Sequence, residues 1–134
     1  MKEKITFDII GGTILGILSW FFGSIDQVFI TFIFFMIIDY FTGMVAAIVN
    51  AKLESHKGWR GILKKTASLF LVAVIYRADV ILPTMNGWES PLRDILIYAL
   101  AINDLISIVE NLGEWGLKIP KFISDRLAKL KNQE

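Results

Sequence analysis

Residues 28–49 read VFITFIFFMIIDYFTGMVAAIV, and Asp39 is the only charged side chain among these 22 positions. As a helix rising 1.5 Å per residue, the stretch covers roughly 33 Å, whereas the hydrocarbon core of a bilayer is about 30 Å thick. It is therefore long enough and apolar enough to cross a membrane. The segment predicts an integral membrane protein.

Three further apolar blocks, 5–22, 63–82 and 92–112, share the chain with this one. Hydrophobic residues make up 54% of the sequence and the mean hydropathy is +0.57, which is far more apolar than a soluble domain of this size needs. We predict an all-α polytopic helical bundle with three to four transmembrane helices, forming a single membrane domain over residues 1–134. Block 5–22 either crosses the membrane or lies on its surface.

Charge placement predicts the orientation of the chain. The connections 23–27 and 83–91 contain no Lys or Arg, whereas a loop at 50–62 and a tail at 118–134 are both basic. The positive-inside rule then puts both basic segments, and with them the C-terminus, in the cytoplasm. The topology determinants beside the third span are Lys52, Lys57, Arg60, Lys64 and Lys65.

The tail has the periodicity of a short amphipathic helix. Apolar side chains recur at helical spacing from Ile119 to Leu130, with charged residues between them. Such a helix serves either as a solvated positive-inside anchor or as a binding site for a cytoplasmic partner.

Polar side chains occur where lipid is expected. Asp39 lies near the middle of its span, where an ionised carboxylate costs roughly 2.5–3.5 kcal/mol, so it requires a partner, water or protonation. It is either an assembly or pore-lining contact or a carboxyl group satisfied inside the bundle. Nearby Thr42, Gly43 and Ala47 form a small-residue face on which helices can approach closely.

The last span is unusually polar along one stripe. Asn103, Ser107, Glu110 and Asn111 recur at helical spacing, continue to Glu114, and stand beside Asp104. We interpret these residues as a buried bundle face or a water-facing pore wall, because either arrangement keeps carboxylates out of lipid.

Charged side chains also mark the ends of the last two spans. Arg77 and Asp79 close the third block, and Arg93 and Asp94 open the fourth on the same side. We expect charge pairing between these two helix ends.

Several function classes find no support in the sequence. Without cysteine there is no disulfide, thiolate metal site or cysteine nucleophile, and the lone His56 gives neither a zinc motif nor a catalytic triad. A net charge of +1 gives no electrostatic basis for binding nucleic acid. We therefore expect no enzymatic activity, no catalytic or metal-ligating residues and no cofactor.

Three patches together resemble the phage holin family that includes the clostridial toxin-secretion holins. They are I-D-Y-F-T-G at 38–43, S-H-K-G-W-R-G-I-L-K-K at 55–65 and N-D-L-I-S-I-V-E-N-L-G-E-W-G-L-K-I-P at 103–120. The resemblance implies a homo-oligomer in the cytoplasmic membrane of the bacterial host, which opens lesions for host cell lysis or toxin secretion. Its functional partner would be an endolysin or toxin that needs no direct contact.

Two other hypotheses remain open. A small ion or solute channel, or an auxiliary subunit of a transporter, would use Asp39, Asp104 and Glu110 along an ion path and would predict selective conductance. A regulatory membrane protein such as an antiholin would cause no permeability.

Overall fold

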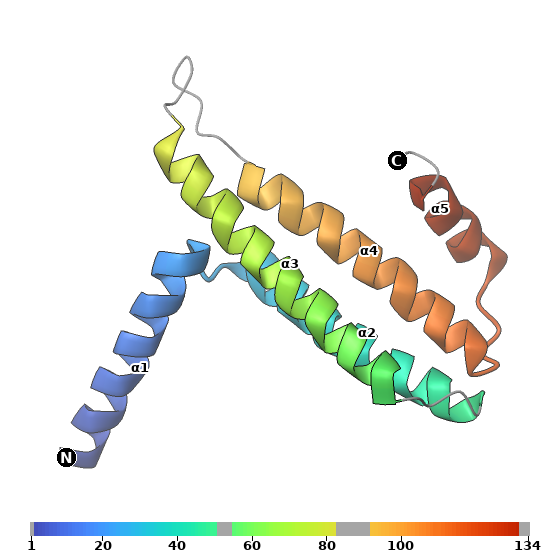
Figure 1. Cartoon of the computed structure of the whole chain (residues 1–134), viewed down its shortest axis with the longest axis horizontal. Helices are drawn as coiled ribbons and strands as arrows, with labels where there is room; N and C mark the ends of the chain where they lie inside the picture. The colour runs from blue at the N-terminus through green and yellow to red at the C-terminus, as the bar shows by residue number, and fades with distance from the viewer. Residues whose placement is uncertain (1, 51–54, 83–91, 132–134) are drawn as a thin grey trace.

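The structure is a computed structural model that describes residues 2–50, 55–82 and 92–131 (Figure 1). Within these ranges all regular structure is helical, which confirms the all-α prediction. The helices are α1 (Lys2–Phe22), α2 (Gln27–Val49), α3 (Ser55–Ile81), α4 (Leu92–Glu114) and α5 (Lys121–Lys131).

Helices α2, α3 and α4 form an up-down-up bundle (Figure 1). The most extensive contact joins α2 to α4, and α3 packs against both. The shared core consists of Phe29, Phe32, Met36, Val72 and Ile97. Most other apolar side chains on the three helices face outward, which is the distribution expected of a small bundle surrounded by lipid.

Among the described residues, three helices, α1, α2 and α4, are long and apolar enough to cross a membrane by length and composition. Helix α3 is longer, with 27 residues, but Lys64, Lys65, Arg77 and Asp79 interrupt its apolar sequence. The helix also begins at Ser55, so most of the segment predicted as the loop 50–62 is helical, while 51–54 lie outside the described residues.

Contact with α2 explains the early start of α3. Gly61 lies against the ring of Tyr40, where a Cβ would be 3.5 Å away, and Gly58 lies near the hydroxyl of the same side chain. The helix therefore gains tertiary contacts in a segment whose glycines and charges favour a loop in isolation. Two of the three sequence patches that carry the family resemblance meet here.

Helix α1 diverges from the bundle and touches it near its C-terminal end (Figure 1). Its apolar side chains are exposed from Ile5 to Phe21, with Phe7 82% exposed, and Phe22 at its end packs against the bundle core. At the junction with α2, Gly23 has a φ of +81°, and the ring of Tyr76 fills the space that a Cβ would need. Glycine is required there on both counts.

Helix α4 ends in a glycine cap that redirects the chain toward α5. Gly116 has a φ of +88°, the Leu117 N–H donates to the Leu112 carbonyl, and the Gly116 N–H donates to the Gly113 carbonyl. This is the Schellman arrangement. Helix α5 then begins at Lys121, in agreement with the predicted amphipathic tail helix.

Candidate functional site

One lysine joins three helices in the middle of the bundle. Lys65 of α3 extends its Nζ to 2.6 Å from Asp39 Oδ2 of α2 and also pairs with Asp104 Oδ1 of α4. All three side chains are at least four-fifths buried. With Thr42 and Asn111 they form what we call the central polar cluster.

Asn111 extends the central polar cluster by about two turns along α4. Its Nδ2 donates to Thr42 Oγ1 at 3.1 Å and lies 3.3 Å from Asp39 Oδ1. One turn further, the indole N–H of Trp115 donates to the Thr42 carbonyl at 3.2 Å. A ladder of hydrogen bonds thus holds α4 against α2 in one register.

The small residues of α2 allow this close contact. A Cβ on Gly43 would lie 3.4 Å from Asn111 Nδ2, so a larger side chain would push α4 away. Ala46 is fully covered, whereas the predicted contact residue Ala47 is half-buried. Gly12 and Gly16 in α1 have the same small-residue spacing as Gly43 and Ala47, but both face open space within the protomer.

Charge pairing explains why the central polar cluster can be buried at mid-helix. Asp39 is the thirteenth of 23 residues in α2, and Asp104 is the thirteenth of 23 in α4, so both carboxylates lie at mid-helix. A charge at this depth is tolerated when it is paired and hydrogen-bonded. Lys65 supplies the positive charge between the two carboxylates, so within the protomer Asp39 is satisfied inside the bundle.

A second buried cation, Arg93, organises one end of the bundle. Its guanidinium donates to the Phe22 and Ser24 carbonyls at 2.6 and 2.7 Å, and pairs with Asp94 at 2.6 Å and Asp26 at 3.3 Å. Arg93 therefore ties the connection between α1 and α2 to the start of α4.

The N-terminal ends of α2 and α4 are both capped by carboxylates in this region. Asp79 of α3 accepts the Arg93 N–H at 2.8 Å, and Asp26 accepts the Phe29 N–H at 2.9 Å. Burial raises the pKa of Asp26, but the Phe29 and Ser24 hydrogen bonds and the Arg93 charge outweigh it and lower the pKa below its usual value. The ends of α3 and α4 are joined by the hydrogen bond from the Arg93 backbone to Asp79 and not by the expected charge pairing. Among the described residues, the Arg93 guanidinium pairs with Asp26 and Asp94, and Arg77 stacks on Trp20.

The predicted polar stripe of α4 divides between two faces. The inward face of α4 carries Arg93, Ile97, Asp104 and Ile108, all buried, together with Asn111 at the edge of this face. Its outward face is formed by Ile95, Ala99, Asn103 and Glu110, all exposed.

The remaining two members of the stripe lie apart from both faces. Ser107 is half-buried between them, and Glu114 accepts a hydrogen bond from Asn50 at 3.0 Å near the end of the helix. The stripe spans a wide arc of the helix, because residues 103 and 111 differ by about 80° at 100° per residue.

Sequence reasoning did not identify three residues that organise these contacts. Lys65 stands beside Lys64 in a basic run and was expected to mark topology, yet it pairs inside the bundle whereas Lys64 is exposed. Arg93 was expected at the rim but is only 6% exposed, and Trp115 was not singled out. Asp39 required a partner, and the available signal was the presence of lysines at the start of the predicted third span.

The remaining topology determinants are only partly described. Arg60 is exposed on α3, whereas Lys52 and the side chain of Lys57 lie outside the described residues. In the described part of the chain, no group of three His, Cys, Asp or Glu side chains could hold a metal ion.

Comparison with known proteins assigns the family. The sequence model of the bacteriophage holin family matches residues 16–132, which include the central polar cluster and the Arg93 contacts. An uncharacterised Listeria monocytogenes protein is 36% identical over 93% of this chain and 85% of its own length, and an uncharacterised Clostridium perfringens protein is 34% identical over 92% and 90%.

A phage protein is among the relatives, and it is described as a probable holin. This protein of Bacillus phage phi105 is 35% identical over 72% of this chain and 68% of its own length. No solved structure matches the chain. With a family match over most of its length, the chain belongs to the bacteriophage holin family.

Proposed function

We propose that this protein is a holin, which accumulates in the cytoplasmic membrane of the bacterial host, assembles with further copies and opens lesions through which a folded endolysin or toxin leaves the cell. Family membership supports this function in general. The observation that carries it to particular residues is the exposure of Asn103 at the middle of α4.

An amide on a lipid-facing surface at this depth lacks hydrogen-bond partners. Asn103 is the twelfth of 23 residues in α4, and among the described residues no hydrogen bond to its side chain is formed. An asparagine amide both donates and accepts, so the same side chain on a second copy is a complementary partner. Ala99, one turn away on the same face, lets another helix approach closely.

The two faces of α4 suggest how assembly could depend on concentration. Asp104 on the inward face is paired with Lys65, so a dilute protomer is stable in lipid, while Asn103 on the outward face gains a partner only when copies meet. Once several copies gather, Asn103 and Glu110 provide polar surface that can face a neighbour or water. The endolysin or toxin passes through the lesion without being bound by this chain.

The function is tested by inducing the protein in a bacterium while following viability and membrane potential, with and without a co-expressed cytoplasmic endolysin. We expect abrupt loss of viability and lysis that requires the endolysin. A folded cytoplasmic reporter protein should appear in the medium at the same moment.

Other outcomes would point to other functions. Depolarisation without release of endolysin or reporter would replace the holin hypothesis with a small channel. Continued growth with an intact membrane potential would instead favour a regulatory protein such as an antiholin, which could then be tested for delaying lysis by another holin.

A further inference from the structure

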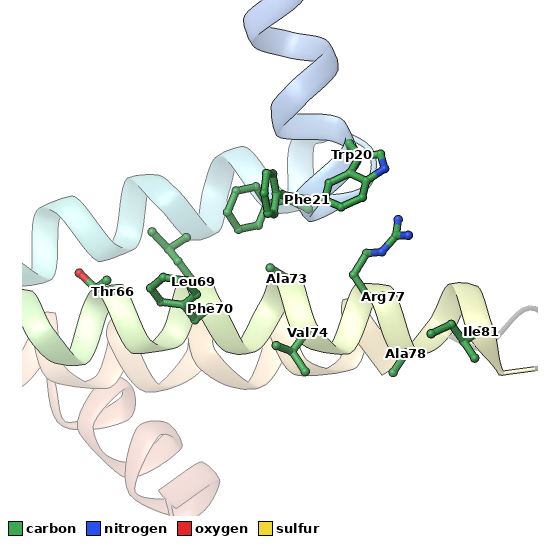
Figure 2. A pocket seen from close by; sticks show the side chains of 11 residues that line it. Trp20, Phe21, Thr66, Leu69, Phe70, Ala73, Val74, Arg77, Ala78 and Ile81 are labelled. Atoms are coloured by element: carbon green, nitrogen blue, oxygen red, sulfur yellow. The ribbon is translucent and has the colours of Figure 1, made fainter.

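An apolar groove of about 720 Å³ lies in the corner between the last turn of α1 and the exposed face of α3 (Figure 2). Its walls are almost entirely hydrocarbon. They include Trp20, Phe21, Leu69, Phe70, Ala73 and Val74, and Phe70 is 69% exposed. Apart from Phe22, whose carbonyl accepts a hydrogen bond from Arg93, the lining residues belong neither to the central polar cluster nor to the Arg93 contacts.

One cation, Arg77, stands among these apolar side chains. Its guanidinium carbon lies 4.5 Å from the centre of the Trp20 ring, and Figure 2 shows the two side chains facing each other. Within the described residues, no carboxylate lies within ion-pair distance of Arg77, in contrast to Arg93, which has two. Stacking on an indole orients a guanidinium but does not neutralise its charge.

The groove runs from one end of the bundle toward its middle. Tyr76, next to Arg77, packs on Gly23, so Arg77 lies level with the connection between α1 and α2. Thr66 lines the far part of the groove, and eleven residues separate it from Arg77, which is about 16 Å along a helix. The cation is thus at the membrane boundary, and the apolar walls extend into the hydrocarbon core.

We propose that this groove binds an anionic phospholipid, with an acyl chain along α3 and the headgroup phosphate on the Arg77 guanidinium. A guanidinium matches the geometry of phosphate oxygens, and tryptophan favours the interface at which headgroups lie. A helix from a second copy could cover the apolar walls, but only an anion also compensates Arg77. The lipid is therefore the occupant that satisfies both parts of the site.

The test uses the full-length protein in vesicles that contain phospholipids with brominated acyl chains, which quench tryptophan fluorescence on contact. Trp20 is one of four tryptophans, so its share of the quenching is the difference between the native chain and Trp20→Phe. We expect brominated phosphatidylglycerol to occupy the groove about fivefold more readily than brominated phosphatidylcholine, which corresponds to about 1 kcal/mol for one basic residue near a headgroup.

Substitutions connect that preference to Arg77. Arg77→Gln should remove it, and Arg77→Lys should retain part, because the charge stays while the planar fork is lost. Arg60→Gln is the matched control, since Arg60 is an exposed arginine near the other end of α3, and it should leave the preference unchanged.

Three results would overturn the proposal. Equal quenching of Trp20 by the two lipids would mean ordinary boundary lipid without recognition of the headgroup. Absence of quenching by both would mean that protein fills the groove, either α1 itself or a second copy. A preference that survives Arg77→Gln would place the recognition elsewhere.

Discussion

The inward and outward faces of α4 carry similar polar side chains in different surroundings. On the inward face, Asp104 meets Lys65, Asn111 meets Thr42 and Arg93 meets the connection between α1 and α2, so each charged or amide side chain there has a partner within the protomer. On the outward face, Asn103 is exposed at the same depth. In the function proposed above, the contrast separates residues that hold one protomer together from Asn103, which gains a partner when a second copy arrives.

The largest expected effect comes from removing the cation of the inward face. Lys65→Met leaves Asp39 and Asp104 buried side by side without a positive charge, and breaking a buried pair in this way costs about 3–5 kcal/mol. We expect little protein in the membrane fraction and a strongly lowered thermal midpoint in detergent, measured by circular dichroism.

Two control variants isolate the charge effect. Lys64→Met removes the exposed neighbouring lysine and should behave like the native protein. Combining Lys65→Met with Asp39→Asn and Asp104→Asn should restore much of the accumulation. If Lys65→Met proved as stable as Lys64→Met, the inward face would not depend on this pairing.

A smaller loss is expected where α2 and α4 approach most closely. Gly43→Leu inserts a side chain against Asn111, and overpacking of this kind typically costs about 1–3 kcal/mol. Gly12→Leu is the matched control, because Gly12 faces open space in the protomer. Thermal unfolding of the two variants in detergent should separate them, and equal midpoints would argue against the close approach.

The outward face should respond in assembly and not in folding. Asn103→Leu should keep the native thermal midpoint, yet weaken association by about 3- to 30-fold, since a hydrogen bond between membrane helices contributes roughly 0.6–2 kcal/mol. Energy transfer between labelled copies in vesicles measures this, and lysis should be delayed. Asn103→Gln, which keeps the amide, should recover much of both. A loss of stability without a change in association would assign Asn103 to the protomer.

The smallest expected effect on stability concerns Asp26, which pairs with Arg93 at the end of the bundle. The lowered pKa of Asp26 means that its contribution to stability is present above the ordinary aspartate pKa and is lost as the pH falls through the lowered value. The native midpoint should therefore fall slightly more than that of Asp26→Asn between pH 5 and pH 2. Parallel curves would mean that Asp26 and Arg93 are not coupled.

The sequence predicted the helices better than their contacts. Apolar blocks and the periodicity after Pro120 indicated all five helices, because hydrophobic length and spacing are local properties. The partner of Asp39 was not predictable in this way, since it depends on the register between α2 and α3. From its neighbours in sequence alone, Lys65 is expected to extend toward the lipid headgroups, because it follows Lys64 at the start of the predicted third span.

The polar stripe of α4 shows the same limit. Helical spacing places Asn103 and Asn111 on one stripe, about 80° apart around the helix, but the position of α2 decides that Asn111 is covered and Asn103 exposed. Arg93 was similarly expected at the rim. Its burial was not predictable, because its partners include two backbone carbonyls that no side-chain pattern reveals.

Disulfide cross-linking in membranes tests most directly whether the outward face of α4 joins copies of this protein. The native chain has no cysteine, so Ala99→Cys on the outward face, Ile97→Cys on the inward face and Phe34→Cys on the exposed side of α2 each introduce a single thiol. We predict that Ala99→Cys forms covalent dimers that increase up to the time of lysis, while the other two variants form few. Lysis without dimers at Ala99→Cys, or equal dimer formation at all three positions, would contradict the proposal that the outward face of α4 joins copies of this protein.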